Sequence, residues 1–434
     1  MKKKTLSIIG GKPLEGEIQI RGAKNALAKI MVAALLSDEE SVIHNVANVS
    51  DVVVVSKMIE LLGGIVENVG DGTIKILAKK LKLVDTKQLH SVAGTSRIPI
   101  LFAGPLLHRE GRAILPELGG CEIGKRPVDF HLKALETLGA VEHNIDGGYE
   151  LIAKTLNGAK ITLDFPSVGA TEQVLLSAVL AKGVTELRNA AVEPEIIDLI
   201  CVLQKMGAII AVNTDRVITI TGVNKLHGFE HSVMPDRIEA GSWACAAAAT
   251  NGRIYVKGAV QSDMMTFLNA FRMVGCEYQV STGGIEFWRG KKTTPISLET
   301  DVHPGFMTDW QQPFTVLLTQ IEGLSIVHET VYEDRFGFTK TLNDMGAQIQ
   351  LYQNCLGKLP CRFAQSNYLH SAVISGPTTL KAREITVPDL RAGFSYVIAA
   401  LVADGTSTIH NIDLIDRGYE SFEDKLKSIG AQIK

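Results

Sequence analysis

The chain has 434 residues, of which 46% are hydrophobic and 21% are charged, a composition that excludes a disordered or low-complexity protein. At roughly 100–200 residues per domain, the length predicts two to four domains. The 44 Lys and Arg residues stand against 47 Asp and Glu residues, and this net charge of −3 gives no basic surplus for a nucleic-acid partner.

The N-terminal residues Lys2–Lys4 are basic, but the apolar stretch after them ends at Gly10, too early for a signal peptide. The longest apolar runs, 30–36 and 243–249, fall far short of the roughly 20 residues that span a bilayer. We therefore expect a cytoplasmic protein with no membrane partner. Its six cysteines contain no C-x-x-C pair and are interpreted as reduced thiols, mostly small buried hydrophobes.

A helical period that ends at a glycine and continues into alternating strand residues occurs six times along the chain. A glycine just beyond a helix supplies a left-handed turn between helix and strand. The intervals between successive glycines are 76, 68, 68, 71 and 84 residues. The six glycines are Gly63, Gly139, Gly207, Gly275, Gly346 and Gly430.

A second pattern accompanies each glycine: an Ala- and Leu-rich buried helix, a turn, and a β-branched strand. A unit of about 70 residues is longer than the 20–50 residues of solenoid repeats, so six units predict two α/β domains of three units each. The predicted helix and strand pairs are 28–36 with 41–43, 98–107 with 113–115, 174–180 with 183–185, 240–249 with 253–256, 314–321 with 324–327, and 394–402 with 406–409.

Polar residues at the ends of these elements are the candidates for chemistry. Lys24 opens the first buried helix, where a cation and the helix N-terminus would hold an anion, although such a lysine is often only solvated. Cys121 lies in a glycine-rich loop beside Lys125 and Arg126, whose charges favour a reactive thiolate over an incidental surface thiol. Asp309 is a candidate base or only the N-cap of the next helix.

Four arginines lie at equivalent junctions of the repeat, and guanidinium groups bind phosphate and carboxylate with two hydrogen bonds. Together they suggest an anion site, although a single arginine is usually a surface charge. The four are Arg97, Arg126, Arg391 and Arg417. His227 and His231 lie four residues apart, but no cysteine or acidic cluster completes a ligand set, so we expect no metal and no other cofactor.

Seven segments, in order and across the whole chain, resemble signature runs of the UDP-N-acetylglucosamine 1-carboxyvinyltransferases, which belong to the enolpyruvyl transferase family. The runs are Gly22–Ala26, Gly119–Asp129, Ser167–Thr171, Glu193–Ile196, Pro235–Glu239, Thr308–Asp309 and Asp416–Glu420.

This resemblance implies a two-domain, inside-out α/β barrel fold built from six βαβαββ-type repeats. Residues 1–22 with 236–434 would form a discontinuous C-terminal domain of three repeats that carries the general base. Residues 23–235 would form the N-terminal domain of three repeats with the mobile cysteine loop. The domains would close around the two small-molecule substrates, and the chain would be a monomer or a weak homo-oligomer.

The implied reaction transfers the enolpyruvyl group of phosphoenolpyruvate to the 3′-hydroxyl of UDP-N-acetylglucosamine and releases phosphate, the first committed step of peptidoglycan precursor synthesis. By resemblance, the catalytic residues are Cys121, which is the general acid and the site of alkylation by fosfomycin, Asp309, which is the base, and Lys24. Phosphoenolpyruvate would be bound by Lys24, Asn25, Arg126, Arg391 and Arg417. The UDP-sugar would be bound by Arg97, Arg126, Pro127, Val128, Asp129, Phe130, Phe165, Pro166, Ser167, Val168, Gly169, Asp309 and Val327.

Three alternatives stay open. Phe165 stands where the family often has a lysine, so the chain could act on a different UDP-sugar. A 5-enolpyruvylshikimate-3-phosphate synthase would carry Ser-Lys-Ser and Asn-Ala-Gly-Thr runs, which this sequence lacks. A catalytically inactive binding protein would not need Lys24, Cys121, Asp309 and Arg417 together.

Overall fold

The computed structural model describes residues 4–93, 96–116, 128–359 and 361–434. These residues divide into two compact units, which we call the C-terminal unit (4–21 and 235–434) and the N-terminal unit (the described residues from 22 to 234). Each unit has a hydrophobic core of its own. The core of the N-terminal unit runs from Ala23 to Val233, and that of the C-terminal unit joins Leu6–Ile20 to the residues from Ile238 to Ile429.

The described part of the C-terminal unit contains three four-stranded sheets. In β14, Ile254 and Val256 are fully buried while their neighbours Arg253 and Lys257 are exposed, which is the period of two of a sheet with one face in the core. The sheets are β21(Glu384–Thr386)-β22(Thr406–His410)-β1(Thr5–Ile9)-β23(Gln432–Ile433), β15(Cys276–Ser281)-β16(Gly284–Arg289)-β14(Arg253–Lys257)-β2(Glu15–Gln19), and β17(Ser297–Glu299)-β18(Gly323–His328)-β20(Ser371–Gly376)-β19(Gln348–Tyr352).

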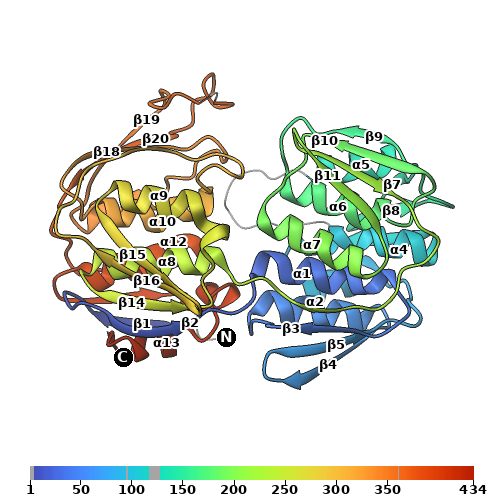
Figure 1. Cartoon of the computed structure of the whole chain (residues 1–434), viewed down its shortest axis with the longest axis horizontal. Helices are drawn as coiled ribbons and strands as arrows, with labels where there is room; N and C mark the ends of the chain where they lie inside the picture. The colour runs from blue at the N-terminus through green and yellow to red at the C-terminus, as the bar shows by residue number, and fades with distance from the viewer. Residues whose placement is uncertain (1–3, 94–95, 117–127, 360) are drawn as a thin grey trace. The chain divides into compact units, whose positions relative to one another are not determined.

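Three long helices, α8 (Arg237–Ala249), α10 (Thr308–Leu318) and α12 (Leu390–Val402), pack against one another inside this unit (Figure 1). Every residue of α8 is buried, and its alanines favour both a helix and close helix packing. A Cβ atom at Gly241 would lie only 2.7 Å from Trp310 of α10, so glycine permits this close contact. The remaining helices are η3 (Gln261–Met264), α9 (Met265–Met273), α11 (Thr339–Asp344), η4 (Ile412–Arg417) and α13 (Phe422–Ser428).

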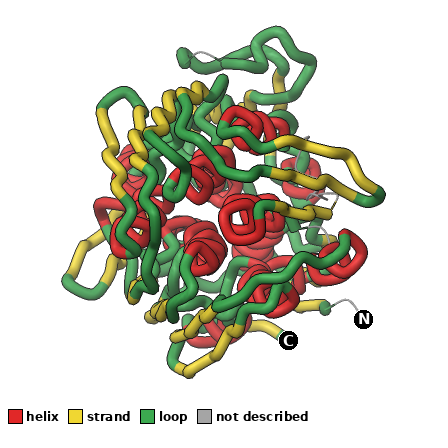
Figure 2. Tube along the Cα trace, turned by 90° about the vertical axis from the view of Figure 1, so that its right-hand side faces the viewer, coloured by secondary structure: helices red, strands yellow, loops and turns green. Residues whose placement is uncertain are grey.

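The N-terminal unit also has its strands outside and its helices inside, as seen in Figure 2 with this unit toward the viewer. Its sheets are β13(Glu230–Ser232)-β3(Ser41–His44)-β5(Thr73–Leu77)-β4(Ile65–Gly70), β11(Ile209–Asn213)-β12(Val217–Thr221)-β10(Val184–Arg188)-β9(Lys160–Thr162), and β6(Arg112–Pro116)-β8(Gly148–Ile152)-β7(Val141–Ile145). Its helices are α1(Lys24–Ala33), η1(Ala34–Leu36), α2(Ser50–Leu61), α3(Thr86–Ala93), η2(Ile98–Phe102), α4(Ala103–Glu110), α5(Asp129–Thr137), α6(Val168–Ala178) and α7(Pro194–Lys205).

The sheets share a strand pattern, because five of them place a short parallel strand at one edge beside antiparallel neighbours. The parallel pairs are β9 with β10, β13 with β3, β2 with β14, β17 with β18, and β21 with β22. The whole described chain is thus an α/β protein. Among its helices, none combines the length and the apolar character that crossing a bilayer requires.

The six predicted glycine junctions are confirmed. All six glycines have positive φ angles, between 83° and 108°, and each follows a helix and precedes a strand. After α7, for example, the Gly207 N–H donates to Gln204 and the Ala208 N–H donates to Leu203, which closes the helix with the hydrogen bonds of a Schellman motif. The six pairs of buried helix and strand predicted from the second pattern are present as well.

We expect Gly430→Ala to lower the free energy of unfolding by roughly 1–2 kcal/mol, because Gly430 has φ +86° and a left-handed conformation strains any residue with a Cβ. No described atom lies within 4 Å of the added Cβ, so the effect comes from the backbone alone. The matched control is Gly337→Ala, which has equal space but no left-handed φ and should not destabilise. Chemical denaturation measures both, and equal effects would contradict the backbone explanation.

Candidate functional site

The structure places Lys24 and Asn25 at the start of α1, with Ala23 at the N-cap and no capping side chain among the described residues. The Lys24 Nζ lies 2.9 Å from Oδ2 of Asp51, a buried residue in the first turn of α2. A helix N-terminus and an ammonium group together attract anions. The predicted lysine is therefore not simply solvated, since it is held by a buried carboxylate.

A cluster of buried charge lies behind these two residues. The Lys29 Nζ donates to the Asn25 carbonyl at 2.5 Å and lies 3.4 Å from Oε1 of Glu172 in α6. Burial raises the pKa of Glu172 to about 7; Lys29 opposes this shift, and the neighbouring Glu195 and Glu193 add to it. The carboxyl group of Glu172 therefore changes charge near neutral pH.

Three segments predicted to bind the UDP-sugar meet around His131 of α5. Burial lowers the pKa of His131 to about 4, partly offset by a hydrogen bond with Gln173, and the positive charge of Arg97 lowers it further. A Cβ atom at Gly169 would lie 2.8 Å from the His131 Nε2. Arg97, at the start of η2, the first turn of α5 and the segment before α6 are thus neighbours.

These segments are helix starts. Val128 is the N-cap of α5, followed by Asp129 and Phe130 in its first turn. Ser167 caps α6 by accepting a hydrogen bond from the Ala170 N–H at 3.3 Å, and its own N–H donates to the Phe165 carbonyl at 2.7 Å. Residues 165 to 169 are all half-buried, so they remain accessible to a ligand. Cys121, Arg126 and Pro127 lie outside the described residues.

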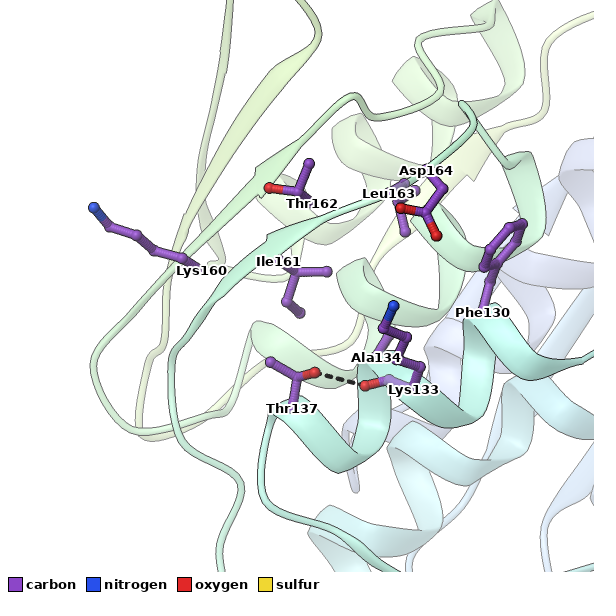
Figure 3. Close-up of a pocket in the computed structure, with 9 residues that line it drawn as sticks. All are labelled: Phe130, Lys133, Ala134, Thr137, Lys160, Ile161, Thr162, Leu163 and Asp164. Carbon is purple, nitrogen blue, oxygen red and sulfur yellow. Dashed lines mark hydrogen bonds between the residues drawn. The ribbon is translucent and has the colours of Figure 1, made fainter.

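Figure 3 shows a pocket of about 160 Å³ between α5 and β9. Of the predicted nucleotide residues that the structure describes, only Phe130 lines it, together with Lys133 and Asp164, whereas the Lys160 side chain extends away from the others. The Thr137 hydroxyl donates to the Lys133 carbonyl within α5 at 2.6 Å. Because it includes so little of the predicted set, this pocket does not define the ligand site.

In the C-terminal unit, Asp309 lies in the first turn of α10 with both carboxylate oxygens beside guanidinium groups. The Arg335 Nη2 donates to Oδ1 at 2.9 Å, and the Arg391 Nη2 lies 3.7 Å from Oδ2. The helix begins at Thr308 with Met307 at the N-cap, so the interpretation of Asp309 as a cap is wrong. Its side chain retains 21% exposure between two buried arginines.

Arg391 is positioned by its own helix and by Tyr419. Asp389 caps α12 by accepting from the Arg391 N–H at 2.8 Å, and the Arg391 Nη1 donates to the Tyr419 hydroxyl at 3.3 Å. Burial alone would lower the pKa of the Arg391 guanidinium, but Tyr419, Asp309 and Asp236 together raise it above its usual value. This group therefore stays charged although it is only 6% exposed.

Arg335 is the site residue that sequence reasoning missed. It follows β18 in an irregular segment, is 2% exposed, and its Nε and Nη1 atoms have no hydrogen-bond partner among the described residues. The only signal in the sequence is an arginine beside aromatic residues, Tyr332 and Phe336, which favour burial. Buried guanidinium donors without partners are unusual and point to an anion.

The two remaining predicted residues belong to the same unit but differ in accessibility. Val327 is fully buried in β18, between β17 and β20, and exposes no surface. Arg417 ends η4 and is half-buried, two residues before the Tyr419 that contacts Arg391. The predicted residues thus form two groups. In the C-terminal unit, Asp309 lies with arginines, and we call these residues the acid and arginine group. In the N-terminal unit, Lys24 and the other predicted residues that the structure describes lie at the starts of helices.

Comparison with known proteins gives matches over the full length. The family profile described as EPSP synthase (3-phosphoshikimate 1-carboxyvinyltransferase) matches residues 8–426. A UDP-N-acetylglucosamine 1-carboxyvinyltransferase of Protochlamydia amoebophila (strain UWE25) is 50% identical, covering 99% of this chain and 93% of its own. The protein of the same name from Chlamydia abortus is 46% identical, covering 98% and 97%.

Two solved structures are similar in fold. The enolpyruvyl transferase NikO from Streptomyces tendae has a TM-score of 0.87 at 22% identity, covering 100% of this chain and 99% of its own. The EPSP synthase from Acinetobacter baumannii has a TM-score of 0.77 at 16% identity, covering 100% of both chains. At these identities the likeness concerns the fold alone.

We expect Glu172→Gln to change how stability depends on pH. The folded-state pKa of Glu172, about 7, lies above the ordinary value of 4.5, so the folded state holds a proton that the unfolded state has lost. The resulting contribution to stability is fully present below pH 4.5 and is lost as pH rises to about 7. The glutamine variant lacks this decline, so its unfolding free energy should increase relative to wild type across that range.

Denaturant unfolding at several pH values measures this difference. The control is Glu67→Gln, the same change at an exposed position of β4 in the same unit, with which the pH profile of Glu172→Gln is compared. Parallel pH profiles for wild type and Glu172→Gln would contradict the assignment.

Proposed function

The chain belongs to the family of UDP-N-acetylglucosamine 1-carboxyvinyltransferases, and on that premise we propose that it transfers the enolpyruvyl group of phosphoenolpyruvate to the 3′-hydroxyl of UDP-N-acetylglucosamine. Phosphate is released, and the product enters peptidoglycan precursor synthesis. The identity of 50% over nearly the full chain carries this proposal. The acid and arginine group around Asp309 supports it, because the reaction needs a base beside an anionic substrate.

We propose that the fold is built from six βαβαββ-type repeats, three in each domain, with the helices inside. The domains would be 1–22 with 236–434, carrying the base, and 23–235, carrying the cysteine loop. The shared strand pattern of five sheets and the six helix–glycine–strand junctions support this division. Free thiols at Cys245 and Cys276 suit a reducing cytoplasm.

In the proposed mechanism, Asp309 accepts the proton of the sugar 3′-hydroxyl. Arg335 donates to one carboxylate oxygen and thereby orients the side chain, and the second oxygen lies near Arg391. As the hydroxyl oxygen bonds to C2 of phosphoenolpyruvate, Cys121 gives its proton to C3. Loss of a proton from C3 and departure of phosphate then restore the double bond in the enolpyruvyl ether.

Phosphoenolpyruvate carries a phosphate and a carboxylate, so its binding needs several cations. We assign Lys24, Asn25, Arg126 and Arg417 to phosphoenolpyruvate, with Arg126 and Arg417 at the phosphate, and Arg391 to the carboxylate. Arg335 joins Arg391 in this assignment, because its Nε and Nη1 donors have no partner among the described residues. These cations also make C2 more electrophilic by neutralising both anionic groups.

The UDP-sugar is assigned to the helix starts around His131 in the N-terminal unit. Arg97 supplies a cation, Ser167 to Gly169 supply the first turn of a helix, and Phe130 and Phe165 supply aromatic surface. Arg126, Pro127, Val128, Asp129 and Pro166 complete this set, with Asp309 and Val327 from the C-terminal unit. Arg97 and the α6 N-terminus suit a diphosphate.

The function is tested by incubating the full chain with phosphoenolpyruvate and a panel of acceptors while phosphate release is measured. We expect release with UDP-N-acetylglucosamine, and mass spectrometry should find one enolpyruvyl group on the sugar nucleotide. Faster turnover of another UDP-sugar would identify a paralogous activity, for which Phe165 would be the first residue to examine. Turnover of shikimate 3-phosphate instead would overturn the proposal.

Asp309→Asn should lower kcat at least a hundredfold, because general base catalysis contributes typically 10²–10⁴-fold and an amide accepts no proton at neutral pH. The asparagine keeps the size of the side chain, so the affinity for UDP-N-acetylglucosamine should change little. Steady-state kinetics and calorimetric titration separate these two effects. The control Asp344→Asn alters an exposed carboxylate of α11 in the same unit and should leave both unchanged; full activity of Asp309→Asn would exclude the base.

Arg335→Met should raise KM for phosphoenolpyruvate at least tenfold, because charge-assisted hydrogen bonds contribute roughly 1.5–3 kcal/mol each. The affinity for UDP-N-acetylglucosamine should change much less, and Arg335→Lys should recover part of the loss. The control Arg272→Met removes a guanidinium stacked 4.3 Å from the Tyr278 ring, outside the assigned site. If both substrates were weakened equally, the effect would be one of folding and the assignment would be wrong.

A further inference from the structure

Four side chains with metal-binding atoms meet at one end of the sheet that contains β18 and β20. The Nε2 or Nδ1 atoms of His328 and His370 and the Sγ atoms of Cys355 and Cys361 all lie within 4.8 Å of one another. His328 ends β18, and His370 precedes β20, where the antiparallel register pairs His328 with Ser371. The two cysteines lie in the connection between β19 and β20. None of these residues has a role in the proposed reaction.

Both histidines have one ring nitrogen fixed by a neighbouring oxygen. The His328 Nδ1 lies 3.3 Å from Oε2 of Glu299, and the His370 Nδ1 donates to the Tyr368 carbonyl at 2.8 Å. In each ring, the outer partner selects the tautomer that leaves Nε2 with a free lone pair. Metal-binding histidines are oriented in this way by a carboxylate or a carbonyl oxygen.

The second nitrogen of each ring, Nε2, is the one that remains for a metal. His328 is fully buried, and its Nε2 has no hydrogen-bond partner among the described residues. The His370 Nε2 lies 3.4 Å from the Cys355 Sγ. A buried ring nitrogen without a partner is costly, so its position beside two thiols and a second imidazole calls for a ligand.

The connection that carries the cysteines is an insertion into a repeated structure. Four comparable hairpins close with two or three residues (71–72, 146–147, 214–216 and 282–283), whereas the connection from β19 to β20 spans residues 353–370 and extends beyond the sheet in Figure 1. It has no regular secondary structure over its described residues. A connection of this length usually has a function or a dedicated means of stabilisation.

The insertion is bound to the sheet around the cluster. Glu299, which contacts His328, accepts the N–H groups of Lys358 and Leu359 at 2.8 Å each. The Cys361 Sγ accepts the Phe363 N–H at 3.4 Å. A side chain at Gly357 would collide with Glu299 and His328, so the chain passes directly over the pair.

We propose that His328, Cys355, Cys361 and His370 form a structural zinc site that fixes the insertion between β19 and β20 to the sheet. Two thiolates and two neutral imidazoles are a common structural zinc ligand set, and their charges balance that of Zn²⁺. On binding, two Zn–S and two Zn–N bonds form, and both thiol protons leave to solvent. All four positions are filled by protein, which leaves none for a substrate.

The distances suit this metal. Zinc bonds of about 2.3 Å to sulfur and about 2.1 Å to nitrogen give roughly 3.4–3.8 Å between the ligands of a tetrahedron. The 3.4 Å from Cys355 Sγ to His370 Nε2 agrees with such an edge, and the widest pair needs about an ångström of closure. This departs from the expectations of no metal and of mostly buried thiols, since Cys355 is exposed and Cys361 half-buried.

The first test is the zinc content of the full chain, expressed with zinc in the medium and measured by elemental mass spectrometry after gel filtration. We expect about one zinc per chain. The double variant Cys355→Ser with Cys361→Ser should retain less than a tenth of that amount. The matched control is Cys201→Ser, an exposed thiol of α7 that should leave the zinc content unchanged. A chain without zinc, or a double variant with unchanged zinc, would overturn the proposal.

A second measurement uses only the wild-type chain, so it does not depend on how the variant folds. After removal of the metal with a chelator, one equivalent of Co²⁺ should produce the visible bands of a tetrahedral site with thiolate ligands. Loading with Zn²⁺ should slow alkylation of Cys355 at least tenfold and leave the rate at Cys201 unchanged. Equal rates at Cys355 with and without Zn²⁺, or a Cys355–Cys361 disulfide in place of metal in anaerobically purified protein, would refute the site. These readouts are independent of the transferase reaction.

Discussion

Both units depend on one constraint: the helices that fill their interiors are buried on nearly every side. Such helices carry charged residues along their length only where a partner of opposite charge lies beside them, because an unpaired buried charge is too unfavourable. Their ends, however, reach polar surroundings and offer unpaired N–H groups and a partial positive charge. The candidate site residues accordingly cluster at helix starts: Lys24 on α1, Asp129 on α5, Ser167 at α6, Asp309 on α10 and Arg391 on α12.

The same constraint explains why the charges near these starts occur in pairs. Four ion pairs illustrate this: Lys24 with Asp51, Lys29 with Glu172, Arg335 with Asp309, and Lys425 with Glu239, the last at 2.6 Å. Removing one member of a buried pair is strongly destabilising, so these residues support the fold as well as the proposed chemistry. An anionic substrate that reaches Lys24 or Arg391 must compete with a carboxylate already in place, which favours a ligand with more than one negative group.

The local parts of this structure could be predicted from the sequence, because they depend on nearest neighbours. A glycine that follows a helical period can adopt the left-handed conformation that ends a helix, and all six such glycines have left-handed φ angles. Arg335 could not be found in this way, since its burial and its contact with Asp309 arise from residues 26 positions apart. The interpretation of Asp309 as a cap was wrong because α10 begins at Thr308, one residue before Asp309, so Asp309 lies inside the first turn.

The cluster of His328, Cys355, Cys361 and His370 escaped sequence reasoning for a related reason. Its ligands belong to no local motif, and only the register of β18 with β20 brings the two histidines together. One signal was present: the interval of 84 residues between Gly346 and Gly430, which is longer than the others. The 18 residues from 353 to 370 account for the excess over a hairpin of two or three.

The insertion also has a physical connection to the group around Asp309. Glu329 follows His328 directly, is fully buried, and accepts the Thr308 hydroxyl at 2.9 Å, one residue before Asp309. Arg362 of the insertion lies 3.6 Å from Glu333, in the segment that leads to Arg335. Lengthening a loop from two to 18 residues raises its closure entropy by about 2 kcal/mol. The proposed zinc ion would offset this loss, and the contact of Arg362 with Glu333 would then join an ordered insertion to the segment that leads to Arg335.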